Sequence, residues 1–219
     1  RKLSVEGRNV KDLSKQEDSG VSVFGMRSLI RNKTLIFILL IILLTQGVAS
    51  SLGLVFQGLL QDMIPDPDLQ TAFSFKFYAW VNSAAAIGQW GLTPLLLARF
   101  HPRSIQIGIP LVLTLGVLCL IFEQSLWLAG GVFLLFKAMD YSVFRASKET
   151  FYIPMSFEER FRVKEFIDIF GYRLGKGLTS GCFALMVGAG VLIGEGGYAM
   201  GSLLMCFGWS AMATRLKKQ

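Results

Sequence analysis

Long apolar stretches alternate with short polar breaks along most of this chain. Six of these stretches approach the roughly 20 residues that an α-helix needs to cross a bilayer. The breaks hold proline, glycine or charged residues, which end helices. We therefore predict an all-α membrane protein with six transmembrane helices, and we expect spans at about 35–60, 75–97, 105–122, 125–145, 167–192 and 198–214.

The segments outside these spans are polar. Residues 1–33 are rich in Lys, Arg, Ser, Glu and Asp, so we expect a cytoplasmic linker or arm there, with 34–219 as the transmembrane domain. The chain begins with Arg1 rather than Met, so we expect an upstream part. Residues 156–166 alternate Phe with charged residues, which is typical of an amphipathic connector at the membrane surface.

Polar residues follow one face of several predicted helices. In the first span Gln46, Ser50, Gly53 and Gln57 recur every three or four residues, so this stripe should face protein rather than lipid. Asn82 lies on a similar face of the second span. The third and sixth spans carry no charge, whereas the fourth and fifth do. This repetition predicts two three-helix repeats, an arrangement that resembles one half of a major facilitator fold.

The composition supports insertion into a membrane. The 219 residues are 53% hydrophobic and only 17% charged, and a soluble domain could not cover so much apolar surface with so few charges. A net charge of +7 would suggest nucleic acid as the partner of a soluble protein. In a membrane protein it indicates cytoplasmic Lys and Arg at helix ends. We expect a lipid bilayer, and no nucleic acid, around this chain.

The distribution of charge among the loops predicts the orientation. An N-terminus in the cytoplasm leaves the acidic loop around Asp66 on the opposite side, in agreement with the positive-inside rule. We therefore expect an integral, multi-pass protein of a bacterial inner membrane with both termini in the cytoplasm. The cytoplasmic bases would be Arg27, Arg31, Lys33, Arg99, Arg103, Arg160, Arg162, Lys164, Arg215, Lys217 and Lys218.

The sequence offers little for catalysis or metal binding. The one histidine, His101, lies in a basic turn. Cys119, Cys182 and Cys206 lie in apolar segments, at spacings that fit neither a disulfide framework nor a metal site. No Ser-His-Asp set or phosphate loop is visible. We therefore expect no enzyme, no metal and no cofactor.

Ionisable residues lie inside the fourth predicted span. On a helix of 100° per residue, one stripe about 140° wide contains Lys137, Asp140, Tyr141, Phe144, Arg145 and Lys148. Lys137 is expected near the middle of the bilayer. An ionisable group there costs roughly 2.5–3.5 kcal/mol, so it normally faces a partner or a wet cavity.

The fifth span adds a second set of charges. Asp168 and Lys176 share one face, with Arg173 on its flank, and Lys176 is also expected near the middle of the bilayer. The two lysines could meet at one depth. With Glu149 included, this region holds five bases against three acids. Buried unpaired cations are costly, so the excess favours an anionic ligand.

Two interpretations of these charges are open. In the structural one, Asp140 pairs with Lys137, and Asp168 with Arg173, only to hold two helices together. In the functional one, the region is an anion site. Its substrate-binding residues would be Lys137, Tyr141, Arg173, Lys176, Asn82 and Gln46, and its gating or ion-pairing residues Asp140, Arg145, Lys148, Glu149 and Asp168.

A specific motif covers about 30 residues of this region. It reads Lys148-Glu149-Thr150-Phe151-Tyr152-Ile153-Pro154, then Lys164, Ile167-Asp168, Arg173 and Gly175-Lys176. The motif resembles the ATP/ADP antiporter family of plastids and intracellular bacteria, which is similar to the major facilitator superfamily. The resemblance implies nucleotide exchange by alternating access, with phosphates held by midplane bases. It also implies that this chain is the C-terminal half of a twelve-span carrier.

Two functions are therefore open. The first is half of a membrane carrier for an anionic phosphorylated metabolite, with ATP/ADP exchange as the activity that the resemblance implies. Its partners would be the anionic small-molecule substrate and a missing N-terminal six-helix half or other membrane subunits. The second is a non-transporting transmembrane scaffold subunit of a larger membrane complex, which retains a carrier-like fold.

Overall fold

The computed structural model describes residues 32–191 and 193–216, and it is 88% helical, with no strand in these residues. An all-helical protein is therefore confirmed. The predicted arm at 1–33 lies almost wholly outside the described residues, as do Lys217 and Lys218 of the predicted C-terminal basic cluster.

Three of the elements in the described part of the chain are π-helical turns, written η. In chain order the elements are α2 (Lys33–Met63), α3 (Pro67–Ile87), η1 (Gly88–Leu92), α4 (Thr93–Arg99), α5 (Pro102–Phe122), α6 (Leu126–Met139), η2 (Asp140–Phe144), α7 (Arg145–Thr150), α8 (Phe157–Phe166), η3 (Ile167–Gly171), α9 (Tyr172–Gly188) and α10 (Glu195–Thr214).

Side-chain caps and prolines explain several of the helix starts. Asn32 accepts a hydrogen bond from the Thr34 amide at 3.1 Å, and Ser125 accepts one from the Leu128 amide at 3.3 Å. Such caps satisfy amides that have no partner in the first helical turn. A proline stands at the start of α3 and of α5, where its missing N–H costs nothing.

Three helical segments of the described chain are long and apolar enough to cross a membrane: Lys33–Met63, Pro102–Phe122 and Leu126–Thr150. The other three predicted spans are not among these candidates. The fifth carries Asp168, Arg173 and Lys176. The sixth, α10, begins with Glu195 and is rich in Gly and Ser. The prediction of six spans therefore stays a prediction.

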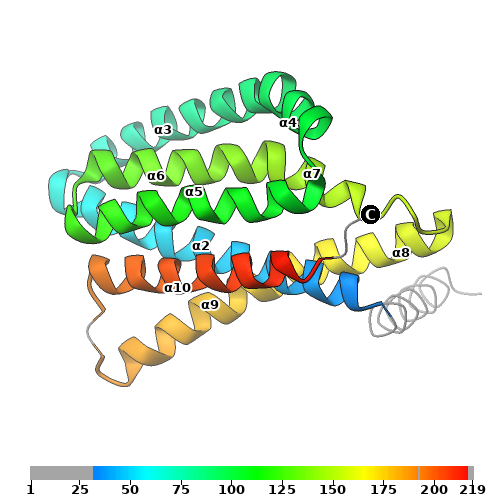
Figure 1. Ribbon diagram of the computed structural model, residues 1–219. Coiled ribbons are helices and arrows are strands. Elements are labelled where there is room, and N and C mark those ends of the chain that lie inside the picture. The colour runs from blue at the N-terminus through cyan, green and yellow to red at the C-terminus, as the bar shows by residue number, and fades with distance from the viewer. Residues whose placement is uncertain (1–31, 192, 217–219) are drawn as a thin grey trace, which may run out of the picture.

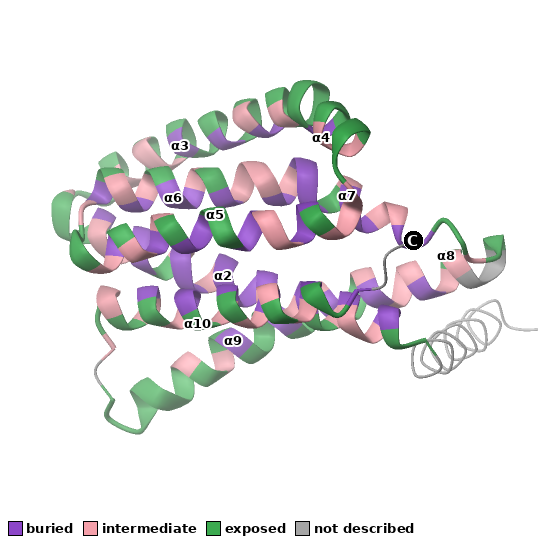
Figure 2. Ribbon diagram, in the orientation of Figure 1, coloured by how far each residue is buried: buried purple, intermediate pink, exposed green. Residues whose placement is uncertain are grey.

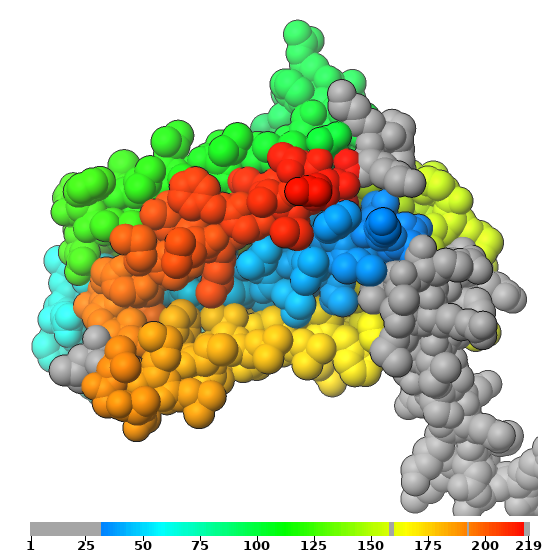
Figure 3. Space-filling view, turned by 60° about the horizontal axis from the view of Figure 1, so that its bottom comes forward, coloured from blue at the N-terminus to red at the C-terminus, as the bar shows by residue number. Residues whose placement is uncertain are grey.

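The long helices lie side by side as a bundle (Figure 1). The turns α2–α3, α5–α6 and α9–α10 lie at one end of the bundle, and the connections from α4 to α5 and from α7 to α8 lie at the other. α10 packs against both α2 and α5, and Figure 3 shows it between them, with α9 on the far side of α2. α2 also packs against α6 and α9, and α6 packs against α3 and α5.

This packing has an internal symmetry. If α2 is exchanged with α6, α3 with α9 and α5 with α10, the set of main contacts among the six helices is unchanged. α3 and α9 are the outer members, and Figure 2 shows them mostly exposed. Among the described residues, only Phe77, Val81 and Ala85 of α3, and Gly175 and Thr179 of α9, are buried.

Glycine allows α9 to approach α2 closely. A Cβ atom on Gly175 would lie 2.7 Å from Cβ of Gln46 and 3.3 Å from Cα of Leu43. Gly47 on α2 is crowded in the same way by Met205 of α10 and Thr179 of α9. Small residues favour helix association in membranes because association there depends on close van der Waals packing. The position of α9 therefore depends on Gly175.

The substitution Gly175→Ala should destabilise the protein, because the new methyl group would overlap Gln46 and the α2 backbone. Overpacking typically costs about 1–3 kcal/mol. Gly177→Ala is the matched control, because a Cβ atom there meets nothing within 4 Å and Ala favours a helix by up to about 1 kcal/mol. The thermal unfolding midpoint in detergent, followed by circular dichroism, should fall only for the first variant. Equal midpoints would contradict close α2–α9 packing.

Candidate functional site

A π turn redirects the charged face predicted for the fourth span. η2 spans Asp140–Phe144, and a π turn holds more residues than an α turn, which rotates everything that follows. Phe144 is fully buried against Trp209, with ring centroids 5.3 Å apart, whereas Arg145 is exposed and Lys148 is buried. The uniform 100° rotation on which the predicted stripe rests does not hold across η2, so the stripe itself stays a prediction.

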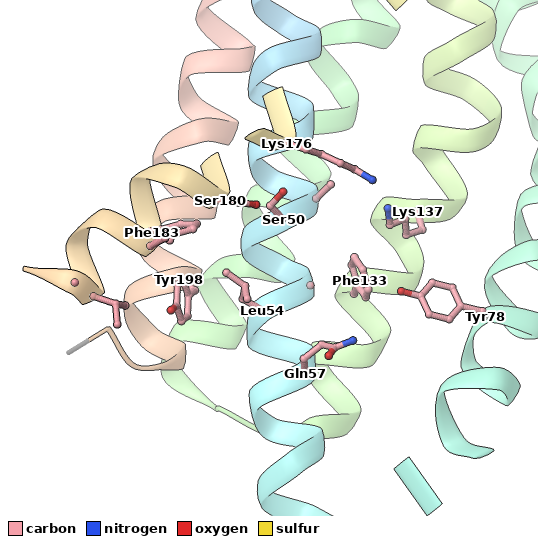
Figure 4. Close-up of a pocket in the computed structure, with 15 residues that line it drawn as sticks. Ser50, Leu54, Gln57, Tyr78, Phe133, Lys137, Lys176, Ser180, Phe183 and Tyr198 are labelled. Carbon is pink, nitrogen blue, oxygen red and sulfur yellow. The ribbon is translucent and has the colours of Figure 1, made fainter. Parts of the chain in front are cut away.

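Lys137 and Lys176 line the same cavity, which has a volume of about 800 Å³. Figure 4 shows the Lys176 side chain extending from α9 toward Lys137 on α6. Side chains of α2, α3 and α10 complete the lining: Ser50, Leu54 and Gln57 from α2, Tyr78 from α3, and Tyr198 from α10. The cavity therefore joins five helices that are distant in sequence.

The Lys137 ammonium is surrounded by aromatic rings. Nζ lies 5.5, 5.8 and 5.4 Å from the ring centroids of Phe133, Phe136 and Tyr141. The guanidinium carbon of Arg145 lies 5.1 Å from the Tyr141 ring. Ring faces attract cations, but they carry no net charge to neutralise them. Within the described residues, no salt bridge involves Lys137 or Lys176.

Two ion pairs lie at the α7 end of the site. Lys148 Nζ is 2.6 Å from Oδ1 of Asp168, with the lysine side chain 5% exposed and the aspartate 32% exposed. Lys164 Nζ is 2.9 Å from Oε2 of Glu149, and both of these side chains are more exposed. The predicted pairing of Asp168 with Arg173 is therefore corrected: Asp168 pairs with Lys148, because η2 turns Lys148 inward toward η3.

These pairs change the charge balance around the cavity. Asp168 and Glu149 are already bound to Lys148 and Lys164, so Asp140 is the remaining acid of the predicted site. Asp140 is only 3% exposed, and its Oδ1 has no hydrogen-bond partner among the described residues. Its carboxylate is within electrostatic range of four bases, Lys137, Arg145, Lys148 and Lys176. One carboxylate does not balance Lys137 and Lys176, the two lysines that line the cavity, so the cavity keeps a positive excess.

Four predicted substrate-binding residues, Gln46, Asn82, Tyr141 and Arg173, are not among those that line this cavity. Gln46 is buried in the α2–α9 contact beside Gly175. Asn82 is exposed on α3, and Arg173 is exposed on α9, three residues before Lys176. Tyr141 touches the site through its contacts with Lys137 and Arg145. The roles assigned to these residues stay predictions.

Other lining residues were not selected from the sequence. Ser180 and Phe183 lie one and two turns after Lys176 on the same helix face, and Tyr198 packs edge-on against Phe183 at 4.9 Å. The helical period of α9 could have identified Ser180 and Phe183. Tyr198 could not have been found in this way, since its approach depends on the turn between α9 and α10. No group of three or more potential metal ligands occurs in the described residues.

The motif Lys148–Pro154 forms a closed turn after α7. The amides of Phe151, Tyr152 and Ile153 donate hydrogen bonds to the carbonyls of Lys148, Glu149 and Thr150, at 3.1, 3.1 and 3.2 Å. The side chains of Phe151 and Tyr152 are buried. Burial, together with the nearby Asp168 and Glu149 carboxylates, raises the pKa of the Tyr152 phenol well above its usual value. Tyr152 therefore stays neutral, and the turn holds Lys148 and Glu149 toward their partners.

An apolar helical bundle with an unbalanced cationic cavity defines an integral membrane protein. A family model described as "TLC ATP/ADP transporter" matches residues 110–219, half of the chain. The chain belongs to this family, which is one of transporters rather than enzymes. The family predicted from the motif at residues 148–176 is thus confirmed, and the match is consistent with a C-terminal part of such a transporter. Neither a curated protein nor a solved structure matches the chain.

The variant Asp168→Asn should be strongly destabilised, because it leaves the buried Lys148 ammonium without a carboxylate. We expect a loss of about 2–3 kcal/mol, below the 3–5 kcal/mol typical of a fully buried pair, since Asp168 is partly exposed. Glu149→Gln, in the more exposed pair, should cost less than about 1 kcal/mol. Denaturant unfolding in detergent compares the two variants.

The double variant Lys148→Met with Asp168→Asn separates pairing from other effects. Removing both charges should recover part of the loss seen in Asp168→Asn, because no ion is then left buried without a partner. The single variant Lys148→Met completes the comparison. If the double variant lost as much unfolding free energy as the two single variants together, Lys148 and Asp168 would not be coupled.

Proposed function

We propose that this chain is one half of an alternating-access carrier that exchanges ATP and ADP, with the substrate in the cavity between Lys137 and Lys176. The observation that carries the proposal is the convergence of two lysines, neither bound to a carboxylate among the described residues, on one cavity. Phosphate oxygens would supply the missing negative charge, since ionised donors and acceptors form the strongest hydrogen bonds.

The cavity fits a nucleotide in size and chemistry. Its volume of about 800 Å³ lies within the usual range of about 300–1,000 Å³ for small-molecule sites. Phosphates would lie at the lysines, and the aromatic rings of Phe183, Tyr198 and Tyr78 offer surfaces on which an adenine ring can stack. In this proposal Arg173 is a further phosphate ligand, and Asp140 is the gating acid that pairs with the lysines when substrate leaves.

The proposed fold has six membrane spans arranged as two three-helix repeats, like one half of a major facilitator fold. The symmetry of the helix contacts supports it, because each of α2, α3 and α5 has a counterpart with equivalent neighbours. α3 and α9 flank the cavity and are largely exposed along their length. We propose that an N-terminal six-helix half covers this face and completes the substrate site.

Neutral variants of the two lysines test the function. Lys137→Gln and Lys176→Gln should each weaken ATP and ADP binding by about 10- to 100-fold, because a hydrogen bond to a charged group contributes about 1.5–3 kcal/mol. Lys33→Gln removes the same charge outside the cavity and should bind as the unaltered protein does. Equilibrium binding of labelled nucleotide and counter-exchange in proteoliposomes are measured on the whole transporter that contains this chain.

The charge-reversed variant Lys176→Glu should abolish nucleotide exchange while the protein is still expressed and inserted. Unchanged exchange in this variant would remove the proposal. Absence of nucleotide binding by the unaltered protein would instead favour the second function, a non-transporting scaffold subunit.

Cysteine labelling tests the proposed orientation, in which both termini are cytoplasmic. In a protein whose three native cysteines are replaced, Gln124→Cys in the α5–α6 turn should react with a membrane-impermeant maleimide added to intact cells. Ser104→Cys, near the opposite end of α5, should react only after permeabilisation. The reverse labelling pattern would overturn the orientation, and equal labelling would show that α5 does not cross the membrane.

A further inference from the structure

A second cavity, of about 380 Å³, lies between α3 and α6 and reaches Phe56 of α2. It shares no lining residue with the cavity of Lys137 and Lys176. Its walls are mainly aromatic, with Phe73 and Trp127 in edge contact at 6.2 Å and Phe56 stacked on Phe77 at 4.4 Å. We call this cavity the aromatic groove.

The aromatic groove is open to the outside of the bundle. Trp80 and Trp127 line it and are 70% and 72% exposed. Gly130 and Gly131 line the α6 side, and a Cβ atom on Gly131 would meet nothing within 4 Å. The groove therefore has a smooth apolar wall without projecting side chains at these positions, a shape that suits a flexible hydrocarbon chain.

A third cavity, whose lining includes one acid and one base, adjoins one end of the aromatic groove. It has a volume of about 430 Å³, lies at the α2–α3 turn and shares Phe73 and Lys76 with the groove. Asp66 also lines it, and the Gln70 side chain holds the turn by donating to the Ile64 carbonyl at 2.7 Å. The apolar groove thus leads to Lys76 and then to Asp66. This order of apolar and charged groups matches that of a lipid with a charged headgroup.

The charges at this end favour a headgroup that carries both signs. Lys76 is exposed and forms no salt bridge within the described part of the chain, so its ammonium is available to a phosphate. The turn also carries Asp62, Asp66 and Asp68, so a headgroup with only negative charge would be repelled. Oδ1 of Asp66 accepts the amides of Asp68 and Leu69, at 2.8 and 3.4 Å, which leaves its second oxygen for an ammonium group.

We propose that the aromatic groove is a binding site for an aminophospholipid of the phosphatidylethanolamine class. One acyl chain lies along Gly130 and Gly131, the phosphate binds Lys76, and the primary ammonium binds Asp66. Trp80 and Trp127 flank the glycerol region, as aromatic residues do at the level of lipid headgroups. The site is separate from the proposed nucleotide cavity.

Quenching of tryptophan fluorescence by lipids with brominated acyl chains tests the proposal in reconstituted vesicles. Trp127 serves as the reporter in a protein with Trp80→Phe and Trp90→Phe. Brominated phosphatidylethanolamine should associate about three- to tenfold more strongly at Trp127 than brominated phosphatidylcholine or phosphatidylglycerol. Trp90, exposed on η1 and outside the groove, is the control reporter with Trp80→Phe and Trp127→Phe, and should show no preference. The buried Trp209 is unchanged in both proteins.

Three variants assign the parts of the lipid. Asp66→Asn keeps the helix cap, because Asn caps as well as Asp, and should abolish the preference over phosphatidylcholine. Lys76→Gln should weaken the association of all three phospholipids at Trp127. Gly131→Leu places a larger side chain in the groove, at a position where a Cβ atom meets nothing within 4 Å, and should reduce quenching by every lipid.

Two results would overturn the proposal. Equal association of the three lipids at Trp127 would show that the groove meets only bulk lipid. Absence of quenching at Trp127, with normal quenching at Trp90, would show that protein covers the groove, either a second copy of the chain or another transporter segment. Neither result bears on nucleotide binding at Lys137 and Lys176, so this proposal and the proposed function fail independently.

Discussion

A positive charge placed within an apolar helical bundle must find negative charge or water, and this constraint governs the region around α6 and α9. Lys148 satisfies it within the chain by pairing with Asp168. Lys137 and Lys176 have no such pair among the described residues and extend into a shared cavity. The same requirement thus produces a structural contact at one end of the site and an open binding position further along it.

Local backbone geometry decides which lysine takes which role. η2 lies between Lys137 and Lys148; Lys137 lines the cavity, whereas Lys148 pairs with Asp168. η3 lies directly before α9 and carries Asp168, the acid that pairs with Lys148. The turn at Lys148–Pro154 connects these segments and buries Tyr152. The family motif is therefore a structural unit as well as a chemical one.

Much of this fold follows from the sequence, because apolar length and polar breaks determine where helices begin and end. The polar stripe at Ser50, Gly53 and Gln57 lines the cavity of Lys137 and Lys176. Two features could not be predicted from the sequence. A π turn leaves no clear mark in residue periodicity, so the helical wheel did not include the change of rotation at η2. The partner of Asp168 depends on the distance between helices, which one sequence does not contain. The same limit explains the selection of Gln46 as a binding residue. Its contact with Gly175 depends on how closely α9 approaches α2, and the sequence does not give that distance.

The outer position of α3 and α9 has a mechanical consequence. α3 packs mainly against α6, and α9 packs mainly against α2. In contrast, α2 packs against α6, α9 and α10, and α10 packs against α2 and α5. Local opening requires the least energy where the fewest buried contacts must separate. α3 and α9, two walls of the cavity of Lys137 and Lys176, are thus its most compliant parts, and its floor is the stiffest. Small lateral displacements of these walls can widen or narrow the cavity while the floor keeps its shape.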